Sequence, residues 1–168
     1  DLLTEKGLTY EKDGALWYRA AEYGEKYQPK KHLDRDGNEE GIKDEVLVRA
    51  NGNPTYFAAD IAYHRNKFLR GFDTLIDIWG ADHHGHVARM KGAMDAIGLD
   101  GERLEVVLMQ LVRLVRDGEV VRMSKRSGKA IGLSDLLDEV PVDAARFFFN
   151  QREANTQMEF DLGLAIEQ

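Results

Sequence analysis

The stretch LIDIWGADHHGHVARMKGAMDAI, residues 75–97, decides the fold class that the sequence predicts. Leu75 to Trp79 form a short apolar run of strand length, and Gly80 breaks it. Residues from about His84 to Ile97 then follow a helical pattern. A strand, a glycine turn and a helix are typical of a doubly wound α/β sheet, in which ligands bind beyond the carboxyl ends of the parallel strands. We therefore expect an α/β fold with a parallel sheet.

On the amino-terminal side, we expect strands at residues 8–11, 15–20 and 45–49, the first two joined as a hairpin. Residues 24–44 are rich in charged residues, glycine and asparagine and lack an apolar period, which predicts a flexible polar insertion. A helix is predicted from Thr55 to about residue 69. Thr55 is its expected N-cap, since it directly follows a proline.

On the carboxyl-terminal side, residues 104–115 are apolar and β-branched enough for a buried strand. The dipeptide Asp117-Gly118 then predicts a β-hairpin, with residues 112–115 and 120–123 as its arms. Helices are expected at residues 133–140, capped by Ser134, at residues 142–151, and from Leu162 onward. The last part of the chain is therefore predicted to be a helical segment.

Residues 122–129, RMSKRSGK, place four cations on a short segment that contains glycine and serine. The chain as a whole carries a formal net charge of -7. A basic loop just past a strand end is suited to binding phosphate, although a solvated charge cluster in a surface turn is the alternative. An acidic domain is a poor nucleic-acid binder on its own, so the loop suits a small triphosphate better than a polynucleotide.

Composition excludes several classes of protein. The 168 residues are 43% hydrophobic and 32% charged, which suits one domain or a part of one. The chain has no cysteine, so it has neither disulfides nor a thiolate zinc site. No apolar run approaches the roughly 20 residues that span a bilayer. The phosphate-binding, dinucleotide-binding and hydrolase motifs built on glycine are absent from the sequence.

Tyr56 and Asp60 are four residues apart in the predicted helix, so both project from one face. A carboxylate beside a phenol suits a guanidinium, because the planar cation donates two parallel hydrogen bonds to a carboxylate. The alternative is an aromatic side chain that packs and an acid that is solvated.

Residues 80–86, GADHHGH, allow three interpretations. The first is a metal site built on the three histidines, but adjacent histidines point in different directions and no metal-binding helix motif follows. The second is a nucleotide site: Gly80 lets a ligand approach the backbone, Asp82 accepts hydrogen bonds from ribose hydroxyls, and the next helix begins nearby. The third is a capping role for Asp82, which is compatible with the second.

Three motifs together resemble one family. Met123 to Gly128, MSKRSG, is similar to the second signature of class I aminoacyl-tRNA synthetases, Lys-Met-Ser-Lys followed by Ser or Arg. TYFAADIAYH at residues 55–64 and WGADHHGH at residues 79–86, in this order and spacing, resemble arginyl-tRNA synthetase. Residues 142–148 and 160–162 also fit. The resemblance extends from about Gly14 to about Leu164.

The resemblance implies a partial class I synthetase catalytic domain with a Rossmann-like sheet. Residues 1–132 would be its C-terminal half, with the signature-like loop at 122–128, and residues 133–168 would lead toward the stem-contact and anticodon-binding domain. The family's first signature, His-Ile-Gly-His, is absent. We therefore expect a fragment that is inactive alone; a noncatalytic interaction or regulatory module is the alternative.

The implied reaction is ATP-dependent ligation of arginine to its tRNA through an arginyl-adenylate. Lys125 would be the catalytic residue, stabilising charge on the β- and γ-phosphates. The ATP-binding residues would be Gly80, Asp82, His83, Met123 and Lys125. The arginine-binding residues would be Tyr56, Asp60 and His83. Arg122 stands where the family pattern has lysine, so its role stays open.

The same resemblance implies the cofactors and partners. ATP is a substrate, Mg²⁺ arrives with it, and no protein-bound metal is expected. The partners are arginine and tRNA(Arg), the latter through regions mostly outside this chain. A cytoplasmic, monomeric parent protein that does not enter a membrane is expected.

Overall fold

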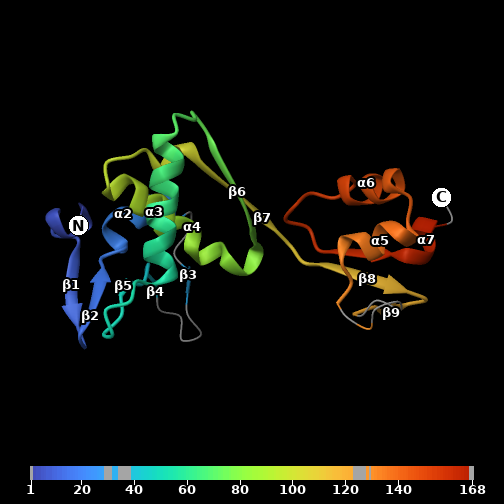
Figure 1. Ribbon diagram of the computed structural model, residues 1–168, viewed down its shortest axis with the longest axis horizontal. Coiled ribbons are helices and arrows are strands. Elements are labelled where there is room, and N and C mark those ends of the chain that lie inside the picture. The colour runs from blue at the N-terminus through green and yellow to red at the C-terminus, as the bar shows by residue number, and fades with distance from the viewer. Residues whose placement is uncertain (1, 29–31, 34–38, 123–127, 129, 167–168) are drawn as a thin grey trace. The chain divides into compact units, whose positions relative to one another are not determined.

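The computed structural model describes residues 2–28, 32–33, 39–122, 128 and 130–166. Within this part, the chain is a mixed α/β protein that divides into two compact units. The first comprises residues 1–78 and 82–107, and the second comprises residues 79–81 and 108–168. The predicted α/β class is confirmed. The described strands, labelled in Figure 1, form small separate sheets that include parallel pairs, among them β8 with β10.

The first unit begins with a three-stranded sheet in the order β1–β2–β5. β1 (Thr9–Lys12) and β2 (Ala15–Tyr18) are antiparallel, and β5 (Glu45–Val48) pairs antiparallel with β2. Asp13 and Gly14 both have positive φ, 53° and 74°, which is the geometry of a type I′ turn. Such a turn joins adjacent antiparallel strands, so the predicted hairpin and third strand are confirmed.

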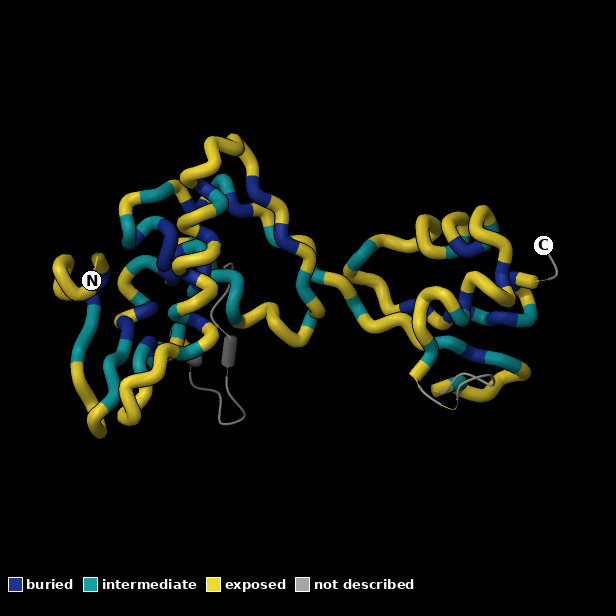
Figure 2. Tube along the Cα trace, viewed as in Figure 1, coloured by how far each residue is buried: buried dark blue, intermediate teal, exposed yellow. Residues whose placement is uncertain are grey.

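Two long helices complete this unit, α3 (Tyr56–Leu69) and α4 (His84–Ala96), and both match the predicted positions. Thr55 is the N-cap of α3, since its hydroxyl oxygen accepts a hydrogen bond from the Ala58 N–H at 3.3 Å. In Figure 2, the buried segments of these helices alternate with exposed ones, as an amphipathic helix requires. The largest fully buried side chains of the unit are those of Tyr18, Met90, Met94 and Leu104.

Two short helices precede the predicted polar insertion, α1 (Leu2–Glu5) and α2 (Ala21–Gly24). The insertion itself begins as regular structure, because α2 ends at Gly24 and a 3₁₀ helix, η1 (Glu25–Tyr27), follows directly. Further on, β3 (His32–Leu33) and β4 (Glu39–Glu40) form a short antiparallel pair. The absence of an apolar period therefore did not mean that this whole stretch lacks regular structure.

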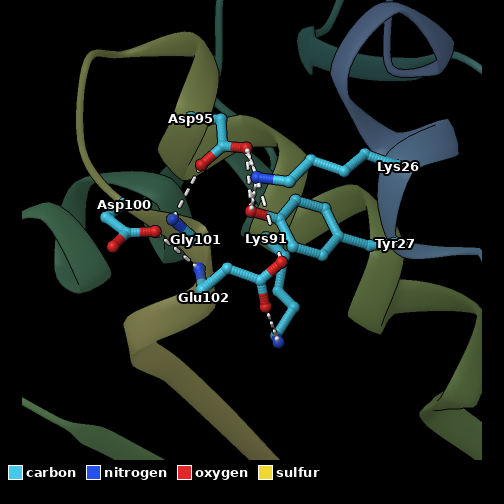
Figure 3. Close-up of polar contacts among 7 residues, drawn as sticks. All are labelled: Lys26, Tyr27, Lys91, Asp95, Asp100, Gly101 and Glu102. Atoms are coloured by element: carbon cyan, nitrogen blue, oxygen red, sulfur yellow. Dashed lines mark hydrogen bonds and ion pairs between the residues drawn. The ribbon is translucent and has the colours of Figure 1, made fainter.

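A cluster of polar side chains ties η1 to the end of α4 (Figure 3). The Asp95 carboxylate accepts hydrogen bonds from the Lys26 ammonium at 3.0 Å, the Tyr27 hydroxyl at 2.8 Å and the Gly101 N–H at 2.7 Å. Gly101 begins the 3₁₀ helix η3 (Gly101–Arg103). One carboxylate thus joins three segments, and its hydrogen bonds explain why charged residues near position 26 are ordered.

β6 (Leu75–Gly80) and β7 (Leu104–Met109) form a two-stranded sheet. Along β6 the burial alternates: Leu75 and Asp77 are buried, whereas Ile76 and Ile78 are exposed. A strand alternates its faces in this way. Gly80 is the last residue of the strand, so the strand ends before the second helix where the sequence predicted a break.

The buried strand predicted at residues 104–115 is wrong, because the segment divides into β7 and β8 (Val112–Arg116) and is largely half-buried or exposed. Leu111, between the two strands, is 88% exposed. At this point the Gln110 N–H donates a hydrogen bond to the Ala154 carbonyl at 3.0 Å. At Gln110 the backbone N–H is therefore bonded to a loop and not to a neighbouring strand, and the predicted strand is interrupted there.

The second unit packs helices against a three-stranded sheet in the order β10–β8–β9. β9 (Glu119–Val120) is joined to β8 through Asp117 and Gly118, with φ of 52° and 80°, so the second predicted hairpin is also confirmed. β10 (Met158–Asp161) was not predicted as a strand and pairs with β8 in parallel. The unit's buried core consists of Leu136, Val140, Ala145, Met158, Phe160, Leu162 and Ala165.

The three predicted carboxyl-terminal helices are present as α5 (Leu133–Glu139), α6 (Val142–Asn150) and α7 (Leu162–Ile166). The expected cap of α5 is wrong: its N-cap is Gly132, not Ser134. The Gly132 N–H donates a hydrogen bond to the Asp135 carboxylate at 3.0 Å. The carboxylate of Asp135, three residues after the N-cap, accepts this N–H. The helix therefore begins at Leu133, one residue before Ser134. Among the described residues, no helix combines the length and apolar character that crossing a bilayer demands.

Candidate functional site

The first turns of α3 present the predicted arginine-binding residues. The Thr55 hydroxyl donates a hydrogen bond to the Val46 carbonyl at 2.6 Å, which fixes the start of the helix to β5. Tyr56 follows directly and is 86% exposed. Asp60, one turn later, is also exposed. Both side chains therefore lie on the accessible face of the helix, as their spacing predicted.

The amino-terminal end of α4 brings two imidazoles close to this part of α3. The rings of His83 and His86 lie 5.9 Å apart, and the His86 ring lies 6.3 Å from that of Phe57, a buried residue of α3. Burial lowers the pKa of His86 below its ordinary value of 6.5, and the Arg89 cation acts in the same direction, whereas the Asp60 carboxylate opposes it. Burial therefore favours the neutral form of the His86 imidazole.

Arg89 attaches this end of α4 to the neighbouring strand. Its guanidinium forms an ion pair with Glu45 of β5, and its Nε–H donates to the Gly85 carbonyl at 3.1 Å. β5 also holds the start of α3, so one strand orients both helices. The structure thus brings the rings of His83 and His86 together next to α3, and the sequence analysis had considered His86 only as a possible metal ligand.

The predicted nucleotide-binding residues follow β6. Gly80 is exposed at the end of the strand, and residues 81–83 form a 3₁₀ turn, η2 (Ala81–His83). Asp82 and His83 are exposed, with 3.5 Å between the Asp82 carboxylate and His83 Nε2. The capping role considered for Asp82 is wrong: the N-cap of α4 is His83, whose side chain makes no capping hydrogen bond.

The histidine tract does not form part of a metal site in the described region. Across residues 2–28, 41–122 and 130–166, no three His, Cys, Asp or Glu side chains are grouped as metal ligands. His83 and His86 approach each other as aromatic rings, and the nearest carboxylate to His83 is that of its neighbour Asp82.

A buried polar network under this region was missed by the sequence analysis. Nε2 of His64 in α3 is hydrogen-bonded to an Asp77 oxygen in β6, and the Lys67 ammonium lies 2.5 Å from the other Asp77 oxygen. Burial acts to raise the pKa of Asp77, but the hydrogen bonds from Lys67 and His64 outweigh it and lower that pKa below 3.8. The sequence contained a signal for this network, because Asp77 lies within an apolar strand. A carboxylate buried there needs a polar or charged partner.

The basic segment at residues 122–129 is described only in part. Arg122 and Gly128 are exposed, and Gly128 has φ of 64°. Met123 and Lys125, the predicted ATP-binding and catalytic residues of this segment, lie outside the described residues. Their roles stay predictions.

Comparison with known proteins shows which proteins the chain is similar to. No family model matches the chain. It is 60% identical over 167 residues to the arginine–tRNA ligase of Caldanaerobacter subterraneus and 60% identical over 163 residues to that of Desulfitobacterium hafniense. A crystal structure from Campylobacter jejuni, assigned as an arginyl-tRNA synthetase, matches 96% of this chain with a TM-score of 0.77 and 40% identity. The chain is homologous to arginyl-tRNA synthetase.

The homology to arginyl-tRNA synthetase covers nearly all of this chain but only part of its relatives. The matches include 99% and 97% of this chain, and 27% and 26% of the two ligases. The Campylobacter match covers 32% of that protein's chain. The arginyl-tRNA synthetase of Thermus thermophilus shares the fold, with a TM-score of 0.65 at 17% identity over 98% of this chain and 35% of that one. The chain thus spans about a quarter of the length of its curated relatives.

Proposed function

We propose that this chain is the arginine- and ATP-binding part of an arginyl-tRNA synthetase, which ligates arginine to tRNA(Arg) through an arginyl-adenylate. The observation that carries the proposal is the exposed Asp60 carboxylate on α3, one turn after the exposed Tyr56, in a chain 60% identical to arginine–tRNA ligases. A carboxylate in this setting is matched to a guanidinium, the group that distinguishes arginine from other amino acids.

At the arginine end, Asp60 accepts paired hydrogen bonds from the guanidinium. Tyr56, one turn earlier and 86% exposed, supplies a phenol to the same ligand. His83 lies near the amino-acid moiety from the α4 side. Lysine would be a poor substitute for arginine here, because its ammonium is a point charge without the planar fork that a carboxylate matches.

At the ATP end, Gly80 allows close approach of the adenosine, and Asp82 and His83 contact it from the turn after β6. Met123 packs at the nucleotide. Lys125 stabilises the charge that develops on the β- and γ-phosphates as pyrophosphate leaves, and Mg²⁺ carried with ATP neutralises the same oxygens. The protein's task is positioning and charge stabilisation, since the arginine carboxylate itself is the nucleophile.

The proposal includes the fold around these residues. β6 and the helix that follows it belong to a Rossmann-like class I catalytic domain, of which residues 1–132 form the C-terminal half. Residues 133–168 lead toward the stem-contact and anticodon-binding domain. The missing first signature belongs to another part of the enzyme, so the 168 residues alone are expected to be inactive. A monomeric enzyme of the cytoplasm stays the prediction.

A chimera tests the proposal directly. The 168 residues replace the matching region of the Caldanaerobacter ligase, which is 60% identical over 167 residues. Arginylation of tRNA(Arg) by the chimera, with pyrophosphate release that depends on arginine, is the expected result. A folded chimera without arginylation would favour the noncatalytic module instead.

Two substitutions in the chimera assign the ends of the site. Asp60→Asn is expected to raise KM for arginine roughly ten- to a hundredfold, the size of one lost charge-assisted hydrogen bond, with little change in KM for ATP. The matched control is Asp73→Asn, an exposed acid just beyond α3. Equal losses for arginine and ATP would contradict the role of Asp60.

Lys125→Ala is expected to lower the rate of adenylate formation roughly 10²- to 10³-fold with a modest change in KM for ATP. The control is Lys6→Ala, since Lys6 is an exposed lysine that follows α1. Unchanged turnover in Lys125→Ala would remove the catalytic role of this residue.

A further inference from the structure

His64 and Asp77 are the two buried polar or charged residues in the described part of the chain, with 3% and 6% of their surface exposed. They join α3 to β6 through a hydrogen bond between His64 Nε2 and an Asp77 oxygen. The other ring nitrogen, Nδ1, lies 2.7 Å from the carbonyl oxygen of Asp60. A carboxylate oxygen and a carbonyl oxygen are both hydrogen-bond acceptors, so each ring nitrogen of His64 lies against an acceptor.

Stability alone does not explain the buried pair of His64 and Asp77. Burying a carboxylate and an imidazole carries a desolvation cost, and well-packed apolar side chains of similar volume are often at least as stabilising. A buried pair does restrict how its two elements can lie, because each group is satisfied in one geometry only. The pair therefore fixes the register of α3 against β6.

The elements that the pair joins carry the two ends of the proposed site. The Asp60 carbonyl bound by His64 belongs to the residue whose exposed carboxylate we assign to the guanidinium. β6, which holds Asp77, leads within three residues to Gly80 and then to the turn with Asp82 and His83. A fixed path of hydrogen bonds thus runs from the Asp60 backbone to the strand before the nucleotide-binding turn.

We propose that His64 and Asp77 are positioning residues for arginine, holding the Asp60 turn of α3 in place against β6 at Asp77. This inference rests on the proposed function of Asp60. Neither residue touches substrate; each acts through the backbone that carries Asp60.

The test uses His64→Gln in the chimera, because a glutamine amide reaches the Nε2 position and keeps a donor for Asp77 but loses the bond to the Asp60 carbonyl. KM for arginine is expected to rise about tenfold, the equivalent of about 1.4 kcal/mol, while KM for ATP changes less than about twofold. Asp77→Asn, which keeps the shape and removes the charge, is expected to raise KM for arginine about threefold.

Lys67→Met is the matched control, since it removes the other partner of Asp77 without a bond to Asp60. It is expected to lower the melting temperature and to leave both KM values within about twofold. Melting temperatures of the same variants in the 168-residue chain separate stability from positioning. An unchanged KM for arginine in His64→Gln, or equal increases in all three variants, would overturn the inference. The unsubstituted chimera decides the proposed function separately.

Discussion

Gly92→Ala tests the packing of α2 on α4, on which the first unit depends. A Cβ at position 92 would lie 2.6 Å from the backbone nitrogen of Gly24, 2.7 Å from its Cα and 2.8 Å from the carbonyl carbon of Tyr23. Ordinary contact begins at 3.4 Å, so α2 would have to move by about 0.6 to 0.8 Å. All three atoms belong to the backbone, and no side-chain rotation relieves the overlap.

The expected magnitude combines two opposing effects. Overpacking of this kind costs about 1–3 kcal/mol, and alanine regains up to about 1 kcal/mol over glycine as a helix former. We expect a net loss of about 1–2 kcal/mol in the free energy of unfolding. With a slope of about 1–1.5 kcal/mol per molar urea, the unfolding midpoint should fall by about 1 M, measured by tryptophan fluorescence and circular dichroism.

Gly85→Ala is the matched control on the same helix. Its added Cβ would meet only the Arg89 guanidinium nitrogen at 3.7 Å, an ordinary contact. The midpoint should stay unchanged or rise, because the helix preference of alanine acts alone. If Gly92→Ala unfolded at the same urea concentration as the unsubstituted chain, α2 would not lie against α4 and the reasoning would be wrong.

Two further predictions concern the same unit. Tyr18→Phe should leave the melting temperature unchanged or raise it, because the fully buried Tyr18 hydroxyl has no hydrogen-bond partner in the described structure; a loss above about 1 kcal/mol would reveal a partner. Burial acts to raise the pKa of Asp95, but hydrogen bonds from Gly101, Tyr27 and Lys26 lower it below 3.8. Its contribution to stability is therefore complete above about pH 4 and is lost as pH falls through the lowered value. The melting temperatures of the unsubstituted chain and of Asp95→Asn should therefore differ at neutral pH and become equal in acid. A difference that stays constant with pH would exclude this role.

Local sequence signals predicted the elements whose formation depends on near neighbours. Both Asp-Gly turns have positive φ at each of their two residues, and each joins an antiparallel pair. Thr55 caps α3 with its own hydroxyl. The i, i+4 spacing of Tyr56 and Asp60 was sufficient to place both on one exposed face. Each of these features is decided within about five residues, so no distant partner was needed to predict it.

Contacts between distant segments decided the features that the sequence analysis missed. β10 became a strand because β8, more than 40 residues earlier, offered it a parallel partner. The apolar run at residues 104–115 was divided where Gln110 bonds Ala154. His86 joined the candidate site because the folding of α4 against α3 placed its ring beside Phe57. Periodicity carries no information about such partners, because it records which face is apolar and not what covers it.

The sequence by itself indicated the resemblance to arginyl-tRNA synthetase through three motifs, and it predicted α3, β6 and α4, on which two of those motifs lie. Only the tertiary structure decided that Asp77 is buried against His64 and Lys67, and that Asp95 joins three separate segments. The physical reason is the same in both cases. A carboxylate is stable away from water only when its partners are already in place, and those partners lie 10 or more residues away along the chain for Asp77 and up to 69 for Asp95.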